Sequence, residues 1–378
     1  MIPFNKPYLV GNELSYISDA YRTGHFSGDG KYTHLCSRWL KNYSGASEVL
    51  LTHSCTAALE MAAILAQIEV GDEVIMPSFT FVSTANAFVL RGGIPVFIDI
   101  KPDTLNIDET QIESAITAKT KALVVVHYAG ASCNMDTIMT IARRHKLLVI
   151  EDAAQAIGST YKGAPLGTIG DLGCISFHET KNVSCGEGGA LFLNNDTMSE
   201  RARIIRDKGT NRHQYRKGFV DKYTWVDLGS SYLPNELTAA FLYSQLQNLD
   251  SITDARLAIW EKYDEALSPE LNGSILGTPS FEAETKHNAH IYHLRFNCKD
   301  ERDLFIEHME QRKIQCPFHY VSLHSAPYGK LVGRQNGQLK VTVKTSDTLV
   351  RLPLWIGIEQ HVETIIDAIQ NFRKRAIG

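Results

Sequence analysis

The turn Thr-His-Ser-Cys-Thr (52–56) consists of small polar residues and opens a segment with helical spacing of apolar residues. The first N–H groups of a helix have no acceptor within it and lie at the positive end of its dipole, so a turn of this kind binds phosphate readily. Ser176, at the end of a predicted strand, offers a second hydroxyl. The turn alone is equally consistent with a simple helix cap by Ser54.

Two ionisable residues follow other predicted buried strands. Asp152 closes the segment Leu-Val-Ile-Glu-Asp (148–152), and Lys181 follows the strand that ends at Ser176 and Phe177. Both side chains would then lie at the carboxyl edge of one sheet, where ligands gather in folds of this type. By itself the pair is a weak indication, because an aspartate there often caps a helix and a lone lysine is usually solvated.

Other polar patterns exclude two kinds of site. The segment Gly-Glu-Gly-Gly (186–189) leads into a strand and lacks the GxGxxG spacing of a dinucleotide-binding turn. His287, His290 and His293 are spaced by three but have no acid at ligand spacing, which favours surface or packing roles and predicts no metal site.

The elements that must position these residues alternate between about residues 46 and 195. Near-continuous apolar runs joined by helices predict a mostly parallel sheet covered on both faces. The predicted strands are Glu73–Met76, Pro95–Ile98, Ala122–Val126, Leu147–Ile150, Cys174–Phe177 and Ala190–Leu193, and the helices are Thr56–Ile68 and Met135–His145. Polar residues follow these runs, namely Ser54, Thr80, His127, Asp152 and His178.

The pattern changes in the second half of the chain. A polar stretch at 201–232 precedes a long helical pattern over Asn235–Asp264, beside which we place a domain boundary. The predicted units are a large domain of residues 1–250 and a smaller α+β domain of residues 251–378. The smaller unit is predicted to hold strands at Ile291–Phe296 and Cys316–Tyr320 and helices at Arg302–Gln311 and Glu359–Lys374.

The composition is that of an ordinary globular enzyme. A formal net charge of -4 and the lack of a basic tail predict no nucleic-acid partner. Seven scattered cysteines without a CxxC pair favour reduced thiols, and no export signal or long apolar run is visible. These features predict a cytoplasmic protein that does not bind a membrane.

Taken together, the motifs resemble those of the DegT/StrS-type nucleotide-sugar aminotransferases. The matching segments span nearly the whole chain: Ile-Pro-Phe-Asn-Lys-Pro (2–7), Ser-Gly-Asp-Gly (27–30), Pro-Ser-Phe-Thr-Phe-Val-Ser-Thr-Ala-Asn-Ala (77–87), Glu-Asp-Ala-Ala-Gln (151–155), Ser-Phe-His-Glu-Thr-Lys-Asn (176–182), Gly-Glu-Gly-Gly-Ala (186–190) and His-Tyr-Val-Ser-Leu-His (319–324). The resemblance implies the aspartate aminotransferase-like (type I) fold of α/β class, with a mostly parallel seven-stranded sheet, and the cofactor pyridoxal 5'-phosphate.

The resemblance also assigns roles within the cofactor site. Lys181 would bind the cofactor through a Schiff base and then move a proton between substrate and cofactor. Asp152 would keep the pyridine nitrogen protonated, which makes the ring an electron sink. Phe81 would stack on the ring and Gln155 would contact its phenolic oxygen. The phosphate would be held by Ser54, Cys55, Thr56 and Ser176.

One departure from the family concerns a Gly-x-Asn-x-Arg stretch whose asparagine reaches the partner subunit's cofactor. Here Ser231 stands for the asparagine and Leu233 for the arginine, so the resemblance gives Ser231 a weaker phosphate contact across a homodimer. By the same resemblance Tyr320 and His324 would line the substrate cleft. The basic run from Arg203 to Lys217, which includes Arg212, is equally consistent with a solvated face and with a clamp for a nucleotide diphosphate.

Within the family the likeness is greatest to the transaminases that form dTDP-4-amino-4,6-dideoxygalactose (the WecE type). The implied reaction converts dTDP-4-keto-6-deoxy-D-glucose and L-glutamate to that product and 2-oxoglutarate, for O-antigen, lipopolysaccharide or enterobacterial common antigen. His178 is the residue that favours amination at C4, since members that aminate C3 more often have an aromatic residue there. His178 could instead only satisfy a backbone group.

Rival functions remain at this point. The 4-amino-4,6-dideoxyglucose epimer is an alternative product, and the nucleotide base, the amino donor and the placement of the amine stay open. A dehydratase of the same fold would carry a histidine in place of Lys181. A non-catalytic binding protein would have little reason to keep Lys181, Asp152 and Phe81 together, and a nicotinamide dehydrogenase lacks its glycine fingerprint here.

Overall fold

The computed structural model describes residues 1–268 and 275–377, and a mixed eight-stranded sheet lies at its centre. The strand order is β1-β9-β8-β5-β4-β2-β3-β13, in which β9 runs antiparallel to both of its neighbours and the other pairs are parallel. The strands are β1 (Glu48–Thr52), β2 (Glu73–Pro77), β3 (Ile94–Ile98), β4 (Thr120–Val126), β5 (Leu148–Asp152), β8 (Leu172–Ser176), β9 (Gly189–Leu193) and β13 (Arg334–Gln335). The predicted mostly parallel sheet is confirmed, and β13 adds an eighth strand to the seven expected.

Helices cover both faces of this sheet because alternate strand residues point to opposite sides. In β4, Leu123 and Val125 pack with one apolar cluster, whereas Val124 packs with the other. The first cluster includes residues of α1 (Glu13–Thr23), α2 (Lys31–Ser44), α6 (Met135–His145) and α9 (Glu236–Leu246). The second includes residues of α3 (Cys55–Leu65), α4 (Val82–Val89) and α7 (Ser199–Arg206).

A third apolar cluster lies in the C-terminal part of the chain. Its sheet has the order β10-β12-β14 and packs with three helices. The elements are β10 (Ile275–Gly277), β12 (His293–Phe296), β14 (Leu349–Arg351), α10 (Leu249–Leu267), α11 (Lys299–Gln311) and α14 (Val362–Ile377). Helix α10 contributes Ile252 to the first cluster and Ile259 and Tyr263 to the third. A division of the chain near residue 250 stays a prediction, since α10 packs into both clusters.

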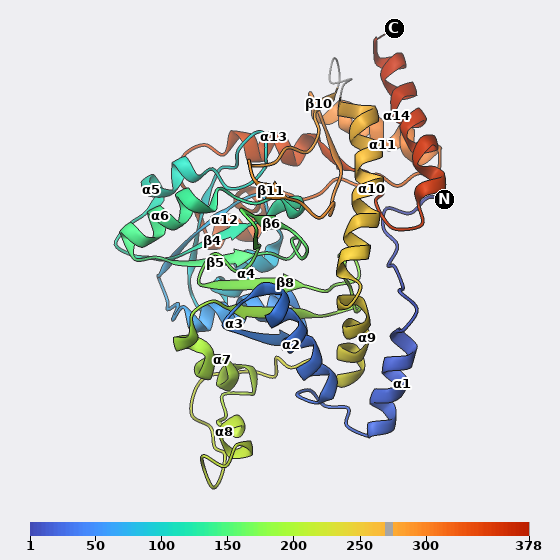
Figure 1. Ribbon diagram of the computed structural model, residues 1–378. Helices are drawn as coiled ribbons and strands as arrows, with labels where there is room; N and C mark the ends of the chain where they lie inside the picture. The colour runs from blue at the N-terminus through green and yellow to red at the C-terminus, as the bar shows by residue number, and fades with distance from the viewer. Residues whose placement is uncertain (269–274, 378) are drawn as a thin grey trace.

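Short elements complete the chain. They are α5 (Ile112–Ala115), α8 (Arg212–Arg216), α12 (Pro327–Val332), α13 (Lys340–Thr348) and a small sheet of β6 (Thr160–Tyr161), β7 (Ala164–Pro165) and β11 (Thr285–Lys286). Figure 1 shows α9 and α10 following one another along one side of the molecule, and α8 projecting from its lower end. No helix within residues 1–268 or 275–377 is long and apolar enough to cross a membrane.

Two predicted elements are wrong. The single helix expected over Asn235–Asp264 is two helices, because the backbone turns at Gln247 and Asn248. Residues Cys316–Tyr320 lie beside β14 but form no strand, because they lack the repeated backbone hydrogen bonds of a sheet. Pro317 O accepts one hydrogen bond from Arg351 N (3.0 Å).

Candidate active site

The main cavity, with a volume of about 590 Å³, lies where polar residues follow the central strands. Asp152 ends β5 within it and is 5% exposed. Its Oδ2 accepts a hydrogen bond from Thr84 Oγ1 (2.7 Å) and its Oδ1 one from Ala154 N (3.2 Å). Burial raises the pKa of Asp152. A positively charged donor in the cavity would therefore stabilise its ionised form.

Lys181 lies in the same cavity on the loop between β8 and β9. Backbone hydrogen bonds fix this loop, from Phe177 N to Gly188 O (2.8 Å) and from Lys181 N to His178 O (2.9 Å). Burial lowers the pKa of the Lys181 amine, and the positive charge of Arg351 lowers it further. A lysine in this state is unprotonated more often than a solvated one, which favours nucleophilic and acid–base chemistry.

The N-terminus of α3 forms another wall of the cavity, lined by Ser54, Cys55 and Thr56. Ser54 caps the helix, since its hydroxyl accepts a hydrogen bond from Ala57 N (3.1 Å). The N–H groups of Cys55 and Thr56 have no acceptor within the helix. A Cβ on Gly189 would lie 2.4 Å from the backbone of Ser54, so only glycine lets β9 pass this close to the turn. Capping and phosphate binding are thus compatible at α3.

Aromatic rings also line the cavity. Tyr320 stacks on His319 with ring centroids 3.7 Å apart, and its hydroxyl accepts a hydrogen bond from Gln155 Nε2 (2.7 Å). Gln155 Oε1 accepts from Ala129 N (2.6 Å), which fixes the amide. Phe81 precedes α4, is 56% exposed and also lines the cavity.

These residues fit the pyridoxal phosphate that the sequence led us to expect. Asp152 offers a buried acceptor for a ring nitrogen, Lys181 a half-buried amine, and α3 with Ser176 offers donors for a phosphate. The exposed ring of Phe81 is free to stack on a ligand. The same cavity therefore supplies a partner of suitable chemistry for the phosphate, the ring and the aldehyde of this cofactor.

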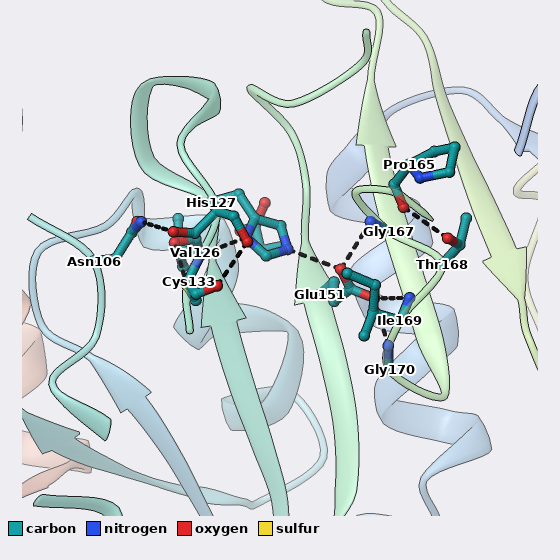
Figure 2. Close-up of polar contacts among 12 residues, drawn as sticks. Asn106, Val126, His127, Cys133, Glu151, Pro165, Gly167, Thr168, Ile169 and Gly170 are labelled. Carbon is teal, nitrogen blue, oxygen red and sulfur yellow. Dashed lines mark hydrogen bonds and ion pairs between the residues drawn. The ribbon is translucent and has the colours of Figure 1, made fainter. Parts of the chain in front are cut away.

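Glu151 precedes Asp152 but faces away from the cavity into a fully buried network (Figure 2). Its two carboxylate oxygens accept hydrogen bonds from Gly167 N (2.8 Å), Ile169 N (2.7 Å) and Gly170 N (2.6 Å). His127 Nε2 lies 2.8 Å from the same carboxylate, while His127 Nδ1 faces Cys133 N (3.3 Å). Glu151 therefore fixes the turn after β7 and the end of β4. It does not line the cavity, so we assign it a structural role and no contact with substrate.

Three of the predicted site residues are not among those that line the main cavity. His324 Nδ1 is paired with Ser78 Oγ (2.7 Å), Ser231 pairs with Asp207 in a short bridge, and Arg212 lies over the ring of Tyr223 at 5.8 Å. The expected lining role of His324 is therefore not found in this chain. Contacts of Arg212 and Ser231 with a partner subunit's site stay predictions.

His178 does line the cavity. Its Nδ1 lies 2.9 Å from Thr180 Oγ1 and accepts a hydrogen bond from Thr180 N (3.3 Å). Its Nε2 lies 3.6 Å from Glu187 Oε1. The ring thus satisfies a backbone group and still borders the space open to a substrate.

Ion pairs within the chain occupy much of the basic run, and whether the run is a solvated face or a clamp stays open. Arg203 pairs with Glu48, and Arg206 and Arg216 both pair with Asp29. Lys208 pairs with its neighbour Asp207 (3.0 Å). These ion pairs use most of the charge that could have bound a diphosphate.

The three histidines spaced by three have separate surroundings. His287 stacks on Phe281 (4.0 Å between centroids), His290 Nδ1 lies 2.9 Å from Asn182 Oδ1, and His293 is buried in β12. Among the described residues no group of three or more His, Cys, Asp and Glu side chains is arranged to hold a metal ion.

Two residues at the site were not singled out by the sequence, Thr84 behind Asp152 and Arg351 in the cavity lining. Thr84, one helical turn beyond Thr80, bonds directly to Asp152. Arg351 interrupts the apolar segment Leu-Val-Arg-Leu-Pro-Leu (349–354), and a charge within such a segment was the available signal.

Comparison with known proteins gives consistent matches over the whole chain. A family model described as the DegT/DnrJ/EryC1/StrS aminotransferase family matches residues 7–370. The spore coat polysaccharide biosynthesis protein SpsC of Bacillus subtilis is 31% identical, with 99% of this chain and 98% of SpsC covered. GDP-perosamine synthase of Caulobacter vibrioides is also 31% identical, with 96% of each chain covered.

A solved structure gives the same result. Spr1654 of Streptococcus pneumoniae, assigned as a sugar aminotransferase, has been solved in PMP and PLP forms. The PMP form superposes with a TM-score of 0.92 at 25% identity, and both chains are covered completely. The fold is therefore that of the type I PLP-dependent aminotransferases, and pyridoxal phosphate is the cofactor.

Proposed function

Because the chain belongs to the DegT/DnrJ/EryC1/StrS aminotransferase family, we propose that it transfers the amino group of L-glutamate to C4 of dTDP-4-keto-6-deoxy-D-glucose. The products are dTDP-4-amino-4,6-dideoxy-D-galactose and 2-oxoglutarate. The observation that supports this most directly is the shared cavity of the half-buried Lys181 and the buried Asp152, whose pKa values are both shifted by desolvation. A dehydratase is disfavoured, since the lysine is present.

Each residue has a defined task in this proposal. The bound cofactor supplies an aldehyde that combines with amines and a ring that accepts an electron pair. Lys181 takes the proton from the donor's α-carbon and later returns one to C4 of the sugar. Asp152, held by Thr84, holds a proton on the ring nitrogen. Phe81 and Gln155 orient the ring, and the α3 turn with Ser176 holds the phosphate.

The sugar nucleotide would enter past His178 and Tyr320, which both line the cavity. We further propose a homodimer in which Arg212 and Ser231 serve the neighbour's site. The exposed aromatic residues close to them, Tyr223 and Trp225, support this proposal. All seven cysteines are free, which is consistent with action in the reducing cytoplasm.

The proposed reaction is tested with the purified holoenzyme, L-glutamate and pairs of keto sugars. We expect amination of 4-keto-6-deoxy sugar nucleotides and little turnover of 3-keto isomers, with NMR of the product giving the position and axial or equatorial placement of the amine. A clear preference for the 3-keto sugar would overturn both the regiochemistry and the role of His178.

A second candidate differs only in the nucleotide. The relative named GDP-perosamine synthase favours a GDP-linked keto sugar, whereas the name of SpsC is consistent with either nucleotide and with a polysaccharide pathway. Surface polysaccharide synthesis, including O-antigen or common antigen, is the proposed destination in both cases. Parallel assays with dTDP- and GDP-linked substrates separate the two, and they also test the alternative 4-amino-4,6-dideoxyglucose product.

A further inference from the structure

The half-buried His290 lines the main cavity, and its hydrogen bonds fix the position of its ring proton. Asn182 Nδ2 donates a hydrogen bond to Asn288 O (2.7 Å), and Asn182 Oδ1 lies 2.9 Å from His290 Nδ1. A backbone carbonyl only accepts, so the amide nitrogen must face Asn288 and the amide oxygen must face the histidine. His290 Nδ1 therefore carries the hydrogen of this contact.

The residues that support this contact are buried and hydrogen bonded. Asn182 is 6% exposed and Asn288 is 0% exposed, and neither of them lines the cavity. Asn288 Nδ2 donates to Gln155 O (2.9 Å) and to Ile157 O (2.7 Å), and its Oδ1 accepts from His290 N (3.1 Å). Rotating the Asn182 amide would place its oxygen against Asn288 O, and two buried acceptors facing one another are costly. The amide orientation is thus fixed.

The other ring nitrogen of His290 remains available to a ligand. Burial lowers the pKa of His290 well below its ordinary value, so the ring is neutral and Nε2 is an acceptor. Among the described residues no hydrogen bond or ion pair reaches Nε2. The backbone N–H is used by Asn288 Oδ1 and the carbonyl by Arg256 Nη2 (3.0 Å). The polar group that His290 offers to the cavity is therefore Nε2.

An acceptor at this place selects a ligand group that donates. Carboxylate and phosphate oxygens accept, so neither of them pairs with a neutral Nε2. On the cofactor, the protonated ring nitrogen is matched by Asp152, the phosphate accepts, and the phenolic oxygen is assigned to Gln155. The donor must therefore come from a substrate, either from a hydroxyl of the sugar nucleotide or from the amine of the amino acid.

The hydrogen bond to Asn182 ties His290 to the loop that carries the reactive lysine. Asn182 is the residue after Lys181, and Lys181 and His290 line the same cavity. The reacting hexose must come to Lys181, whereas the sugar of the nucleoside lies beyond a diphosphate. A 4-keto-6-deoxyhexose has hydroxyls at C2 and C3, and both persist through the reaction. The amine of the amino acid is instead consumed when it combines with the cofactor.

We propose that His290 determines sugar specificity, with Nε2 accepting a hydrogen bond from a hexose hydroxyl of the keto sugar nucleotide. This inference rests on the proposed transaminase function. Asn182 is the positioning residue, because it fixes which ring nitrogen accepts. A sugar that lacks the hydroxyl would leave Nε2 unpaired, and a site of this kind discriminates against such a sugar.

The test compares substrates that differ by one hydroxyl. Wild-type holoenzyme and His290→Phe are assayed with the 4-keto-6-deoxyhexose nucleotide and with its 2-deoxy and 3-deoxy analogues. We expect the wild type to lose about 10- to 100-fold in kcat/KM on one analogue, because an acceptor is left unpaired. In His290→Phe the same two substrates should differ by less than about threefold, since phenylalanine keeps a ring but has no acceptor. His290→Gln, whose amide oxygen can accept, should retain part of the discrimination.

Asn182→Ala tests the fixed proton. Without the amide oxygen the proton can move to Nε2, so this variant should also lose discrimination between the two sugars. A purely structural role for Asn182 would lower both rates and leave their ratio unchanged. The same comparison keeps the inference testable if His290→Phe does not fold.

His287→Phe is the matched control. His287 lies three positions earlier, stacks on Phe281 and is not among the residues that line the cavity. This variant should discriminate between the sugars as the wild type does. Circular dichroism and cofactor content establish that each variant is folded and loaded.

Two results would overturn the inference. One is an equal ratio of rates on the hydroxylated and deoxy sugars in wild type and in folded His290→Phe. The other is an equally large loss in single-turnover conversion of glutamate to 2-oxoglutarate, which would assign Nε2 to the donor amine. The proposed function is judged on the wild type alone. If it aminates no 4-keto-6-deoxy sugar nucleotide, the proposed function is wrong and the inference falls with it, whereas normal amination without discrimination refutes only the inference.

Discussion

Glu151 and Asp152 are consecutive carboxylates with different surroundings, and the difference separates stability from chemistry. Glu151 accepts three backbone hydrogen bonds and faces His127, so its bonding capacity is filled by the protein. Asp152 accepts two hydrogen bonds and lines the cavity, so capacity remains for a ligand. Since alternate residues of a strand point to opposite sides, the strand itself enforces this separation.

Replacing Glu151 with Gln is expected to lower stability by about 3 kcal/mol, because the amide nitrogen would face N–H donors in a buried site. The measurement is urea unfolding at pH 7. The folded fraction should bind cofactor and turn over substrate nearly as the wild type does. Normal stability together with lost turnover would assign Glu151 to the chemistry instead.

Replacing Asp152 with Asn should have the reverse effect. The fold should persist, whereas kcat should fall about 100-fold or more, since a ring nitrogen without a carboxylate partner is a poor electron sink. Steady-state kinetics with glutamate and the keto sugar, beside the unfolding midpoint, provide the measurement. Unfolding of the variant with normal kcat in its folded fraction would show that Asp152 is only structural.

Replacing Lys181 with Ala should abolish turnover and the absorbance of the covalently bound cofactor, because the amine that holds the cofactor and moves the proton is removed. Lys162→Ala is the control, since Lys162 is exposed and paired with Asp136 on the surface. Transamination by Lys181→Ala at a rate near that of the wild type would refute the assignment.

At the scale of elements, apolar patterning predicted which segments become strands but not every pairing. The strands of the central sheet are nearly continuous apolar runs, so their sequences predict them well. Cys316–Tyr320 has similar residues, yet its backbone receives isolated hydrogen bonds from Arg351 of β14 and forms no ladder with that strand. A local pattern of residue types does not contain this information. Strand β13 has two residues, too few for periodicity. The break between α9 and α10 was missed because apolar spacing continues through it.

The residues of the active site divide in the same way, into those that local sequence predicted and those that it did not. Lys181, Asp152 and the α3 turn were predicted because each follows a strand at the same sheet edge. Thr84 and Arg351 were missed because their partners are distant in sequence. Asp152 lies 68 residues from Thr84, and Arg351 contacts Phe318, 33 residues away, and Phe4 near the N-terminus. Such contacts depend on tertiary packing.

A buried histidine of strand β12, His293, predicts how the stability of the protein depends on pH. Burial lowers the pKa of His293 to about 3, and the ring is 2% exposed. An unfolded histidine titrates near 6.5, so between these values the unfolded chain binds the extra proton and the native one does not. Stability is therefore kept above about pH 6.5 and lost as pH falls below it.

Between pH 7 and pH 5 we expect His293 to account for about 1–2 kcal/mol of the loss in unfolding free energy. His293→Phe should remove that part of the pH dependence in urea titrations at the two pH values. His25→Gln is the control: His25 is exposed, so its replacement should leave the pH dependence of stability unchanged. An equal loss in wild type and His293→Phe would contradict the assignment.

At the scale of the whole molecule, the segment of residues 212–228, which begins with α8, extends away from the rest of the protein. It projects from the body of the chain (Figure 1) and carries exposed apolar side chains. Phe219 is 75% exposed and Trp225 is 79% exposed. Large rigid aromatic groups in water indicate a surface that a partner covers.

The exposed ring of Trp225 is also held in position. Its Nε1 donates to Asp227 O (2.7 Å), its backbone pairs with Thr210, and Tyr223 packs with Tyr215 at 5.7 Å between ring centroids. A side chain fixed before binding loses little entropy on association. This supports a second copy of the chain as the partner, with the segment close to its neighbour's cavity.

We therefore expect light scattering to give twice the 42.1 kDa mass of one chain. The double replacement Phe219→Ser and Trp225→Ser should raise the dimer dissociation constant at least about 10-fold, because each aromatic contributes more than 1 kcal/mol at such an interface. Activity should then fall on dilution, since each site would lose residues from its neighbour. Leu331→Ser is the control, because Leu331 is 77% exposed on α12, away from α8. A fully active monomer would rule out this arrangement and the cross-subunit roles of Arg212 and Ser231.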